Sequence, residues 1–132
     1  MKYEFRLSRK DGYLHVRVSG ENSPETVAKY LKQLYEECRK TGCPNVLIEE
    51  NLEGAGMDVG EIFGVVSEGS RTVWPVLQKI AYVDVNPQHD LRNMKFAETV
   101  AVNRSVNIRV FAAVQDAENW LVQQLPPAQE KP

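Results

Sequence analysis

The sequence predicts a single α/β domain whose mixed, mainly parallel sheet has five strands and four helices, in the order ββαβαβαβα. The chain begins with two segments of alternating polarity around a tight turn, which is typical of an antiparallel hairpin. Short apolar runs then alternate with segments of helical spacing, as in strands connected by helices. Because such crossovers join parallel strands, the hairpin is expected to add one antiparallel strand to the sheet.

The first three elements have clear boundaries. Apolar and polar side chains alternate over residues 3–8 and again over residues 14–19, and Asp11-Gly12 supplies the turn between them. Ser23 is suited to cap a helix and Pro24 to occupy its first position, whereas Gly42 is suited to end it.

The rest of the chain continues the alternation. Val46-Leu47-Ile48 predicts a buried strand, and an acidic, glycine-rich turn follows it from Glu49 to Gly60. The remaining predicted elements are a helix from Val59 to about Thr72, a strand from Lys79 to Val85, a helix from Leu91 to Val102, a strand from Asn107 to Phe111 and a helix from Asp116 to Leu125. Residues 1–125 therefore form one predicted domain, and residues 126–132 a disordered tail.

Composition excludes several function classes. The 132 residues are 42% hydrophobic and 26% charged with a net charge of −2, which is typical of a soluble globular protein. The chain has no basic cluster of the kind that binds nucleic acid and no apolar stretch that could span a membrane. We therefore expect a cytoplasmic protein whose two cysteines, Cys38 and Cys43, are reduced and structural.

A family resemblance rests on the strand, turn and helix over residues 47–66 and on the segment over residues 103–121, which runs from Asn-Arg-Ser-Val-Asn through a strand ending in Phe111 to a helix ending in Trp120-Leu121. These features resemble the STAS-like superfamily over most of the chain, and specifically its bacterial branch of anti-sigma-factor-antagonist-like proteins, whose fold is related to CRAL-TRIO lipid-transfer domains. The resemblance implies the fold, and it implies either a protein partner or an apolar ligand.

The sequence departs from that family at one important place. In the antagonists, an Asp followed by Ser or Thr lies near the start of the second helix, and a kinase phosphorylates the hydroxyl. The matching residues here are Asp58-Val59-Gly60, which lack the hydroxyl. Between Glu49 and Gly60 there is no Ser, Thr, Cys, His, Lys or Arg, so the turn also lacks a nucleophile.

Carboxylates are concentrated around this turn. Such a group could include a general acid of raised pKa, or it could hold a hard divalent cation. Alternatively, Asp58 and Glu61 stabilise the amino terminus of a helix, and the other carboxylates are solvated loop residues. The carboxylates lack the spacing of an EF-hand loop and have no His among them, and the glycines fit neither a dinucleotide fingerprint nor a Walker loop, so we predict no metal and no cofactor. The candidate partner-binding residues are Glu50, Asn51, Glu53, Asp58 and Glu61.

Two histidines allow a third interpretation. His89 could act as a base oriented by Asp90, and a small hydrolase could use it with Glu50 or Asp58. The simpler interpretation is that His89 caps or precedes the third helix, and that His15 points to solvent.

Apolar residues on the second and third helices define a candidate ligand site. The space between these helices could hold a small hydrophobic or lipid-like molecule, although the same spacing describes core packing or a dimer face. The candidate residues are Phe63, Val66, Trp74, Leu77, Met94, Phe96 and Val100. The sequence thus favours a non-catalytic regulatory or ligand-binding module, with a protein-interaction module that lacks the phosphoacceptor as the alternative.

Overall fold

The computed structural model describes residues 3–54, 60–61, 64–65, 68, 78–89, 91–104 and 106–122. Its strands are β1 (Tyr3–Lys10), β2 (Tyr13–Glu21), β3 (Asn45–Glu53), β4 (Lys79–Asp84) and β5 (Ile108–Phe111), and its helices are α1 (Pro24–Thr41), α3 (Leu91–Val102) and α4 (Val114–Val122). None of the described helices is long and apolar enough to cross a membrane.

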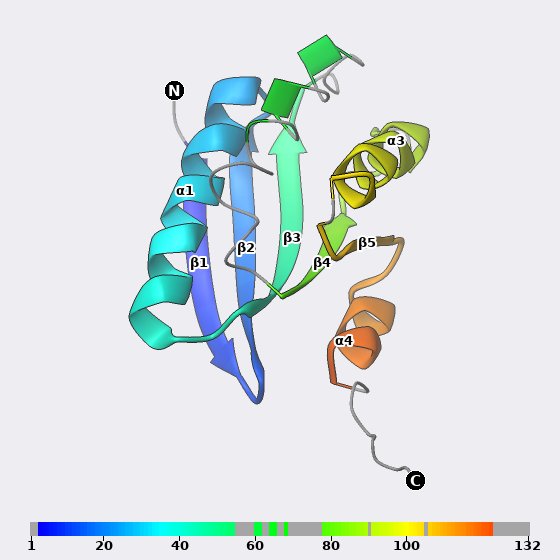
Figure 1. Ribbon diagram of the computed structural model, residues 1–132. Helices are drawn as coiled ribbons and strands as arrows, with labels where there is room; N and C mark the ends of the chain where they lie inside the picture. The colour runs from blue at the N-terminus through cyan, green and yellow to red at the C-terminus, as the bar shows by residue number, and fades with distance from the viewer. Residues whose placement is uncertain are drawn as a thin grey trace, which may run out of the picture.

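The sheet contains five strands in the spatial order β1-β2-β3-β4-β5. The β1–β2 pair is antiparallel, and the three remaining pairs are parallel, which confirms the mixed sheet (Figure 1). The helix count is corrected: three helices have bounds among the described residues, where the sequence predicts four. The predicted helix from Val59 to Thr72 falls mostly outside those residues.

The hairpin and the first helix form as predicted. Gly12 occupies the turn with a φ of 92°, a conformation that suits glycine. At the start of α1, the Ser23 side chain accepts a hydrogen bond from the backbone N–H of Thr26, and Gly42 ends the helix with a φ of 71°. The Gly42 N–H donates to the Cys38 carbonyl, which satisfies one of the last free carbonyls of α1.

Strand β3 is longer than the sequence predicts. The sequence predicts a turn at the acidic residues Glu49, Glu50 and Glu53, but they belong to the strand, which ends just before Gly54. Side chains of a strand alternate between the two faces of the sheet, so charged residues can belong to a strand. Here they interrupt the apolar run from which the strand is predicted. Ile48, Glu50 and Leu52 are buried on one face, so a carboxylate occupies a position that the pattern reserves for an apolar residue.

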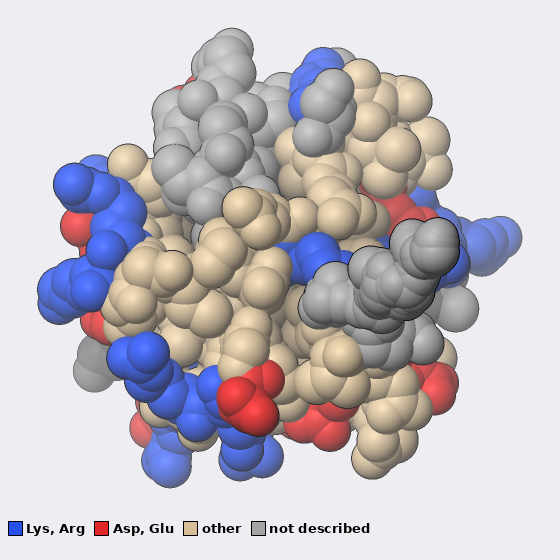
Figure 2. Space-filling view, turned by 60° about the horizontal axis from the view of Figure 1, so that its bottom comes forward, with Lys and Arg blue, Asp and Glu red and all other residues tan. Residues whose placement is uncertain are grey.

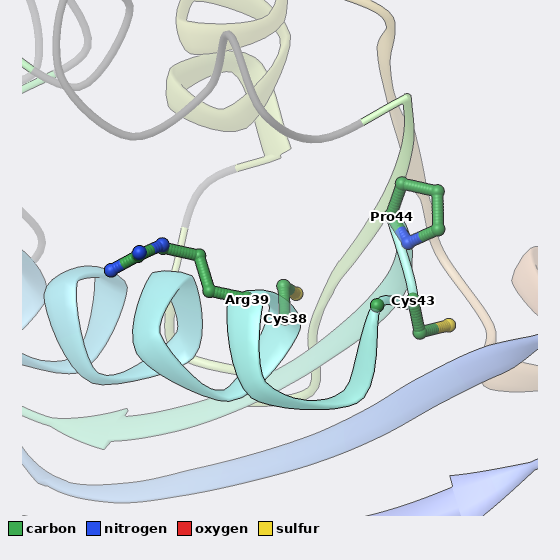
Figure 3. Close-up of a pocket in the computed structure, with 5 residues that line it drawn as sticks. Cys38, Arg39, Cys43 and Pro44 are labelled. Carbon is green, nitrogen blue, oxygen red and sulfur yellow. The ribbon is translucent and has the colours of Figure 1, made fainter.

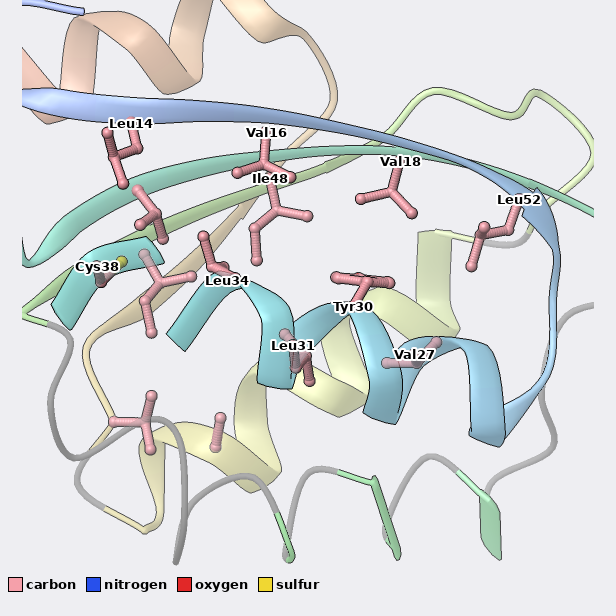
Figure 4. Close-up of a cluster of buried hydrophobic side chains, with 14 of the residues drawn as sticks. Leu14, Val16, Val18, Val27, Tyr30, Leu31, Leu34, Cys38, Ile48 and Leu52 are labelled. Atoms are coloured by element: carbon pink, nitrogen blue, oxygen red, sulfur yellow. The ribbon is translucent and has the colours of Figure 1, made fainter. Parts of the chain in front are cut away.

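One face of the sheet is covered by α1 and α3 and is called the α1 face. Tyr30 and Leu34 of α1 point toward Val16 and Ile48 of the sheet (Figure 4), and all four are almost completely buried. From α3, Val100 and Ala101 join the same cluster. Burying an aliphatic side chain of this size stabilises the folded state by about 1.5–3 kcal/mol, so this cluster is the main core of the protein.

The opposite face is called the α4 face, because α4 packs on it over β3 and β4. A smaller core joins Ala117 and Leu121 of α4 to Leu47 and Val83 of the sheet. The prediction that His15 points to solvent is wrong: its side chain lies on this face and is only 6% exposed. Its ring is held there because Nε2 lies 2.8 Å from a carboxylate oxygen of Glu49.

Candidate functional site

Two carboxyl groups lie side by side at the carboxyl ends of the parallel strands. Glu50 of β3 is the register partner of Asp84 of β4, and Tyr82 precedes Asp84 by two residues on the same strand. Residues two apart on a strand share a face, so all three side chains belong to the α1 face. In α/β proteins, this edge of the sheet is where ligands usually bind.

Glu50 is buried among tyrosines. The residue is only 3% exposed. Its Oε2 accepts a hydrogen bond from the hydroxyl of Tyr30, which projects from α1 and is fully buried. The Tyr82 hydroxyl is a second hydrogen-bond partner of the same carboxyl group. The two phenols thus supply the donors that a buried carboxylate requires.

This environment raises the pKa of Glu50 to about 7 from an ordinary value of 4.5. Burial is the largest cause, and the negative charge of Asp84 acts in the same direction. The hydrogen bonds from Tyr30 and Tyr82 and the charge of His89 oppose the rise without cancelling it. Glu50 therefore changes its protonation state near neutral pH, as groups at functional sites often do.

His89 joins this arrangement from the loop that follows β4. Its Nδ1 lies 2.7 Å from Oδ2 of Asp84, and its Nε2 lies 3.0 Å from the carbonyl oxygen of Gly54. The side chains of His89 and Asp84 are each only 5% exposed. Because both ring nitrogens face acceptor oxygens, the doubly protonated ring satisfies both contacts.

The same contacts shift the pKa of the ring. Burial alone would lower the pKa of His89, but its hydrogen bonds to Asp84 and Gly54, together with the charges of Asp84 and Glu50, raise that pKa. We call Tyr30, Glu50, Tyr82, Asp84 and His89 the carboxyl-edge cluster.

The loop after β4 is also held by Asn86. The Asn86 backbone N–H donates to Oδ1 of Asp84 at 3.0 Å, and its side-chain Nδ2 donates to the Leu52 carbonyl at 2.7 Å. The Gln88 N–H donates to Oδ1 of Asn86 at 2.9 Å. These bonds fasten the loop to the end of β3 and so position His89.

Hydrogen bonds within the cluster engage the groups that could act as bases. Both nitrogens of His89 are occupied by Asp84 and Gly54, and the Glu50 carboxyl is engaged by two phenols. A general base needs a free lone pair within reach of the proton that it removes. The residue that orients His89 is Asp84, whereas the hydrolase hypothesis assigned that role to Asp90, which lies outside the described residues.

A hollow of about 180 Å³ lies at the end of α1 and is lined by Cys38, Arg39, Gly42, Cys43 and Pro44 (Figure 3). Both cysteines are free thiols, as predicted. Burial raises the pKa of Cys38 to about 12, with smaller contributions from Cys43 and Glu37. Since the thiolate is the reactive form, this buried thiol is unreactive near neutral pH.

Comparison with known proteins identifies the fold. No family model matches the chain, and no curated protein matches it. A crystal structure of an uncharacterized protein of the DUF3478 family from Shewanella loihica PV-4, which has a SpoIIAA-like fold, aligns with a TM-score of 0.54 at 16% sequence identity. The alignment covers 90% of this chain and 93% of that chain.

This chain has the SpoIIAA-like fold. That finding confirms the STAS-like fold that the sequence resemblance implies. At 16% identity the likeness concerns the fold alone, so the function must be argued from the residues of this chain.

The structure describes three of the seven residues predicted to bind an apolar ligand. On α3, Met94 and Phe96 are half-buried, whereas Val100 is 6% exposed and belongs to the main core. Phe96 packs partly against that core. The four other candidates, Phe63, Val66, Trp74 and Leu77, lie outside the described residues.

The described residues of the predicted partner-binding loop differ in burial. Glu50 is buried on the α1 face, whereas Asn51 and Glu53 of the same strand are exposed. Glu61 is exposed, and Asp58 lies outside the described residues. Among the described residues, no group of three or more His, Cys, Asp and Glu side chains is placed to hold a metal ion.

Sequence reasoning missed Tyr30, Tyr82 and Asp84. One signal could have found Asp84 and Glu50: each occupies an inward position of an otherwise apolar strand. Tyr30 and Tyr82 carry no such signal, because a tyrosine at an apolar position of a helix or strand usually belongs to the core.

Proposed function

We propose that this protein is a non-catalytic regulatory module that binds a small apolar molecule carrying one polar group. The observation that supports this proposal is the carboxyl-edge cluster, which places a buried, titratable Glu50 where α/β proteins usually bind ligands. The polar group of the ligand would meet the Tyr30, Glu50 and Tyr82 side chains. Its apolar part would lie toward α3, where Met94 and Phe96 are half-buried.

The polar end of the ligand can be described further. A buried carboxyl group that is half protonated near pH 7 can either donate or accept a hydrogen bond, and so can a phenol. The cluster therefore suits a neutral group such as a hydroxyl or a carbonyl. A carboxylate would meet the charges of Asp84 and Glu50 in a poorly solvated place, which costs free energy.

Native mass spectrometry of the freshly purified protein tests the proposal. We expect a native mass above that of the denatured chain, and a small molecule that can be extracted. In the same preparation, Glu50→Gln and Tyr82→Phe are expected to lower the bound fraction, whereas Glu53→Gln, an exposed change on the same strand, is expected to preserve it. A native mass equal to that of the chain alone or of a simple oligomer would contradict the proposal.

A second candidate is a protein-interaction module without the phosphoacceptor. One observation favours it: the outer edge of β1 has no partner strand among the described residues. Binding of a protein segment there, with no bound small molecule, would shift the assignment to this second function.

A further inference from the structure

The β1 strand is a long edge strand with two different faces. It extends over eight residues, and its side chains alternate between half-buried and exposed along most of that length. Tyr3, Phe5 and Leu7 pack against the main core on the α1 face. Glu4 and Arg6 therefore project on the α4 face, where α4 packs over β3 and β4.

Positive charge dominates this edge. Strand β1 contains three cationic residues, Arg6, Arg9 and Lys10, and one anionic residue, Glu4. Figure 2 shows Lys and Arg side chains, with Asp or Glu side chains among them, on the left side of the molecule, which α1, β1 and β2 occupy in Figure 1. No described strand pairs with the outer edge of β1, and an edge without a partner strand can accept a strand from another protein through its backbone groups.

Two like charges face each other beside this edge. Arg6 of β1 is the direct register partner of Arg17 of β2, and Arg17 is in turn the register partner of Glu49 of β3. Like charges directly opposite each other in a sheet are unfavourable. From β3 to β1, this row of register partners consists of the negative Glu49, the positive Arg17 and the positive Arg6 at the outer edge.

The existing ion pairs leave most guanidinium donors available. Arg6 approaches Glu4 at 3.8 Å, and Arg17 approaches Glu49 at 3.4 Å, which are longer than charge-assisted hydrogen bonds of about 2.7–2.9 Å. The Arg6 and Arg17 side chains are 76% and 67% exposed. Both line a hollow of about 270 Å³ on the α4 face, whose other polar lining residues are Glu4, Ser19, Glu49 and Asn51.

We propose that the outer edge of β1 binds an extended acidic segment of a partner protein as an additional antiparallel or parallel strand. Acidic side chains of that strand, directly opposite Arg6, would complete the row with a negative charge at each end. Its alternate apolar side chains would extend the half-buried row formed by Tyr3, Phe5 and Leu7. Backbone hydrogen bonds would supply affinity, and the charges would supply selectivity.

The charge of β1 disfavours a second copy of the chain as the occupant. Pairing of β1 with another β1 would bring two edges of the same positive surplus together, which is unfavourable. An acidic segment has the complementary charge. This surface lies at a different edge of the sheet from the carboxyl-edge cluster, so either proposal can fail without the other.

The test uses a capped heptapeptide that alternates Val and Glu, added to the full-length protein and followed by NMR. We expect shifted and slower-exchanging amides along β1, and at least tenfold weaker binding to Arg6→Glu. The matched control is Arg39→Glu, which reverses a 62%-exposed arginine on α1 and is expected to preserve affinity. A peptide with Lys in place of Glu is expected to bind at least tenfold more weakly, as is a Glu peptide with alternate N-methyl groups.

Three results would overturn the proposal. The first is equal binding of the Glu and Lys peptides, and the second is peptide-induced shifts that avoid β1. The third is a concentration-dependent dimer, seen by analytical ultracentrifugation, that protects the β1 amides and excludes the peptide, because it would assign this edge to a second copy.

Discussion

Substitution of Glu50 by Gln is expected to change how the stability of the protein depends on pH. The folded-state pKa of Glu50 is about 7, against an ordinary value of 4.5. A carboxyl group whose pKa is raised on folding favours the folded state below the unfolded pKa, and that contribution is lost as the pH rises through the folded pKa. Ionisation of Glu50 therefore weakens the fold between about pH 4.5 and pH 7.

The size of the effect follows from the shift. A difference of about 2.5 pKa units corresponds to ~3 kcal/mol, at about 1.4 kcal/mol per unit, and Glu50 is almost fully buried. The Glu50→Gln variant has a neutral amide at every pH. Relative to the wild type, it should therefore gain about 3 kcal/mol in the free energy of unfolding between pH 4.5 and pH 8.

Urea denaturation of both proteins at steps from pH 4.5 to pH 8 measures this difference. Glu53→Gln removes an exposed carboxyl from the same strand, and its curve is expected to run parallel to that of the wild type. A Glu50→Gln curve that also runs parallel to the wild type would refute the reasoning. If NMR shows that the Glu50 carboxyl carbon titrates with a midpoint near 4.5, then the burial that raises its pKa is wrong.

Three further predictions concern other parts of the fold. Because the pKa of His89 is raised, its contribution to stability is complete below pH 6.5 and is lost as the pH rises through the raised value. Urea denaturation should therefore show that His89→Gln destabilises the protein more at pH 6 than at pH 9. Leu34→Ala, at a fully buried position of α1, should lower the free energy of unfolding by about 2–5 kcal/mol, whereas the exposed change Lys32→Ala should alter it by less than about 0.5 kcal/mol. Ser23→Ala should cost about 1 kcal/mol in thermal or urea denaturation while Ser23→Asp retains most of the stability, and an equal loss in both would contradict the capping role.

Local signals in the sequence were sufficient for most of the fold. The Asp11-Gly12 turn, the Ser23 cap and the Gly42 stop mark their elements through backbone preferences that act within a few residues. The sequence also predicted the bounds of α3 from Leu91 to Val102. For α4 the predicted start at Asp116 was two residues late, since the helix begins at Val114.

The sequence-based prediction was wrong at polar residues that are buried. Glu50 looked like a loop carboxylate, although its neighbours Ile48 and Leu52 are buried on the same face of β3. His15 looked solvent-exposed for the same reason. Polar residues in a strand weaken the apolar pattern on which such predictions rest.

The sequence by itself determined the class of the fold, the order of the elements that the structure describes, the single antiparallel strand and the absence of a hydroxyl between Glu49 and Gly60. Only the tertiary structure decided that Tyr30 of α1 and Glu50 of β3 form one buried cluster with Asp84 of β4 and with His89 of the loop that follows β4. The physical reason is that local preferences act over a few residues along the chain. The pKa of Glu50 and the pairing of His89, in contrast, depend on burial and charge contributed by segments that meet only when the sheet and α1 pack together.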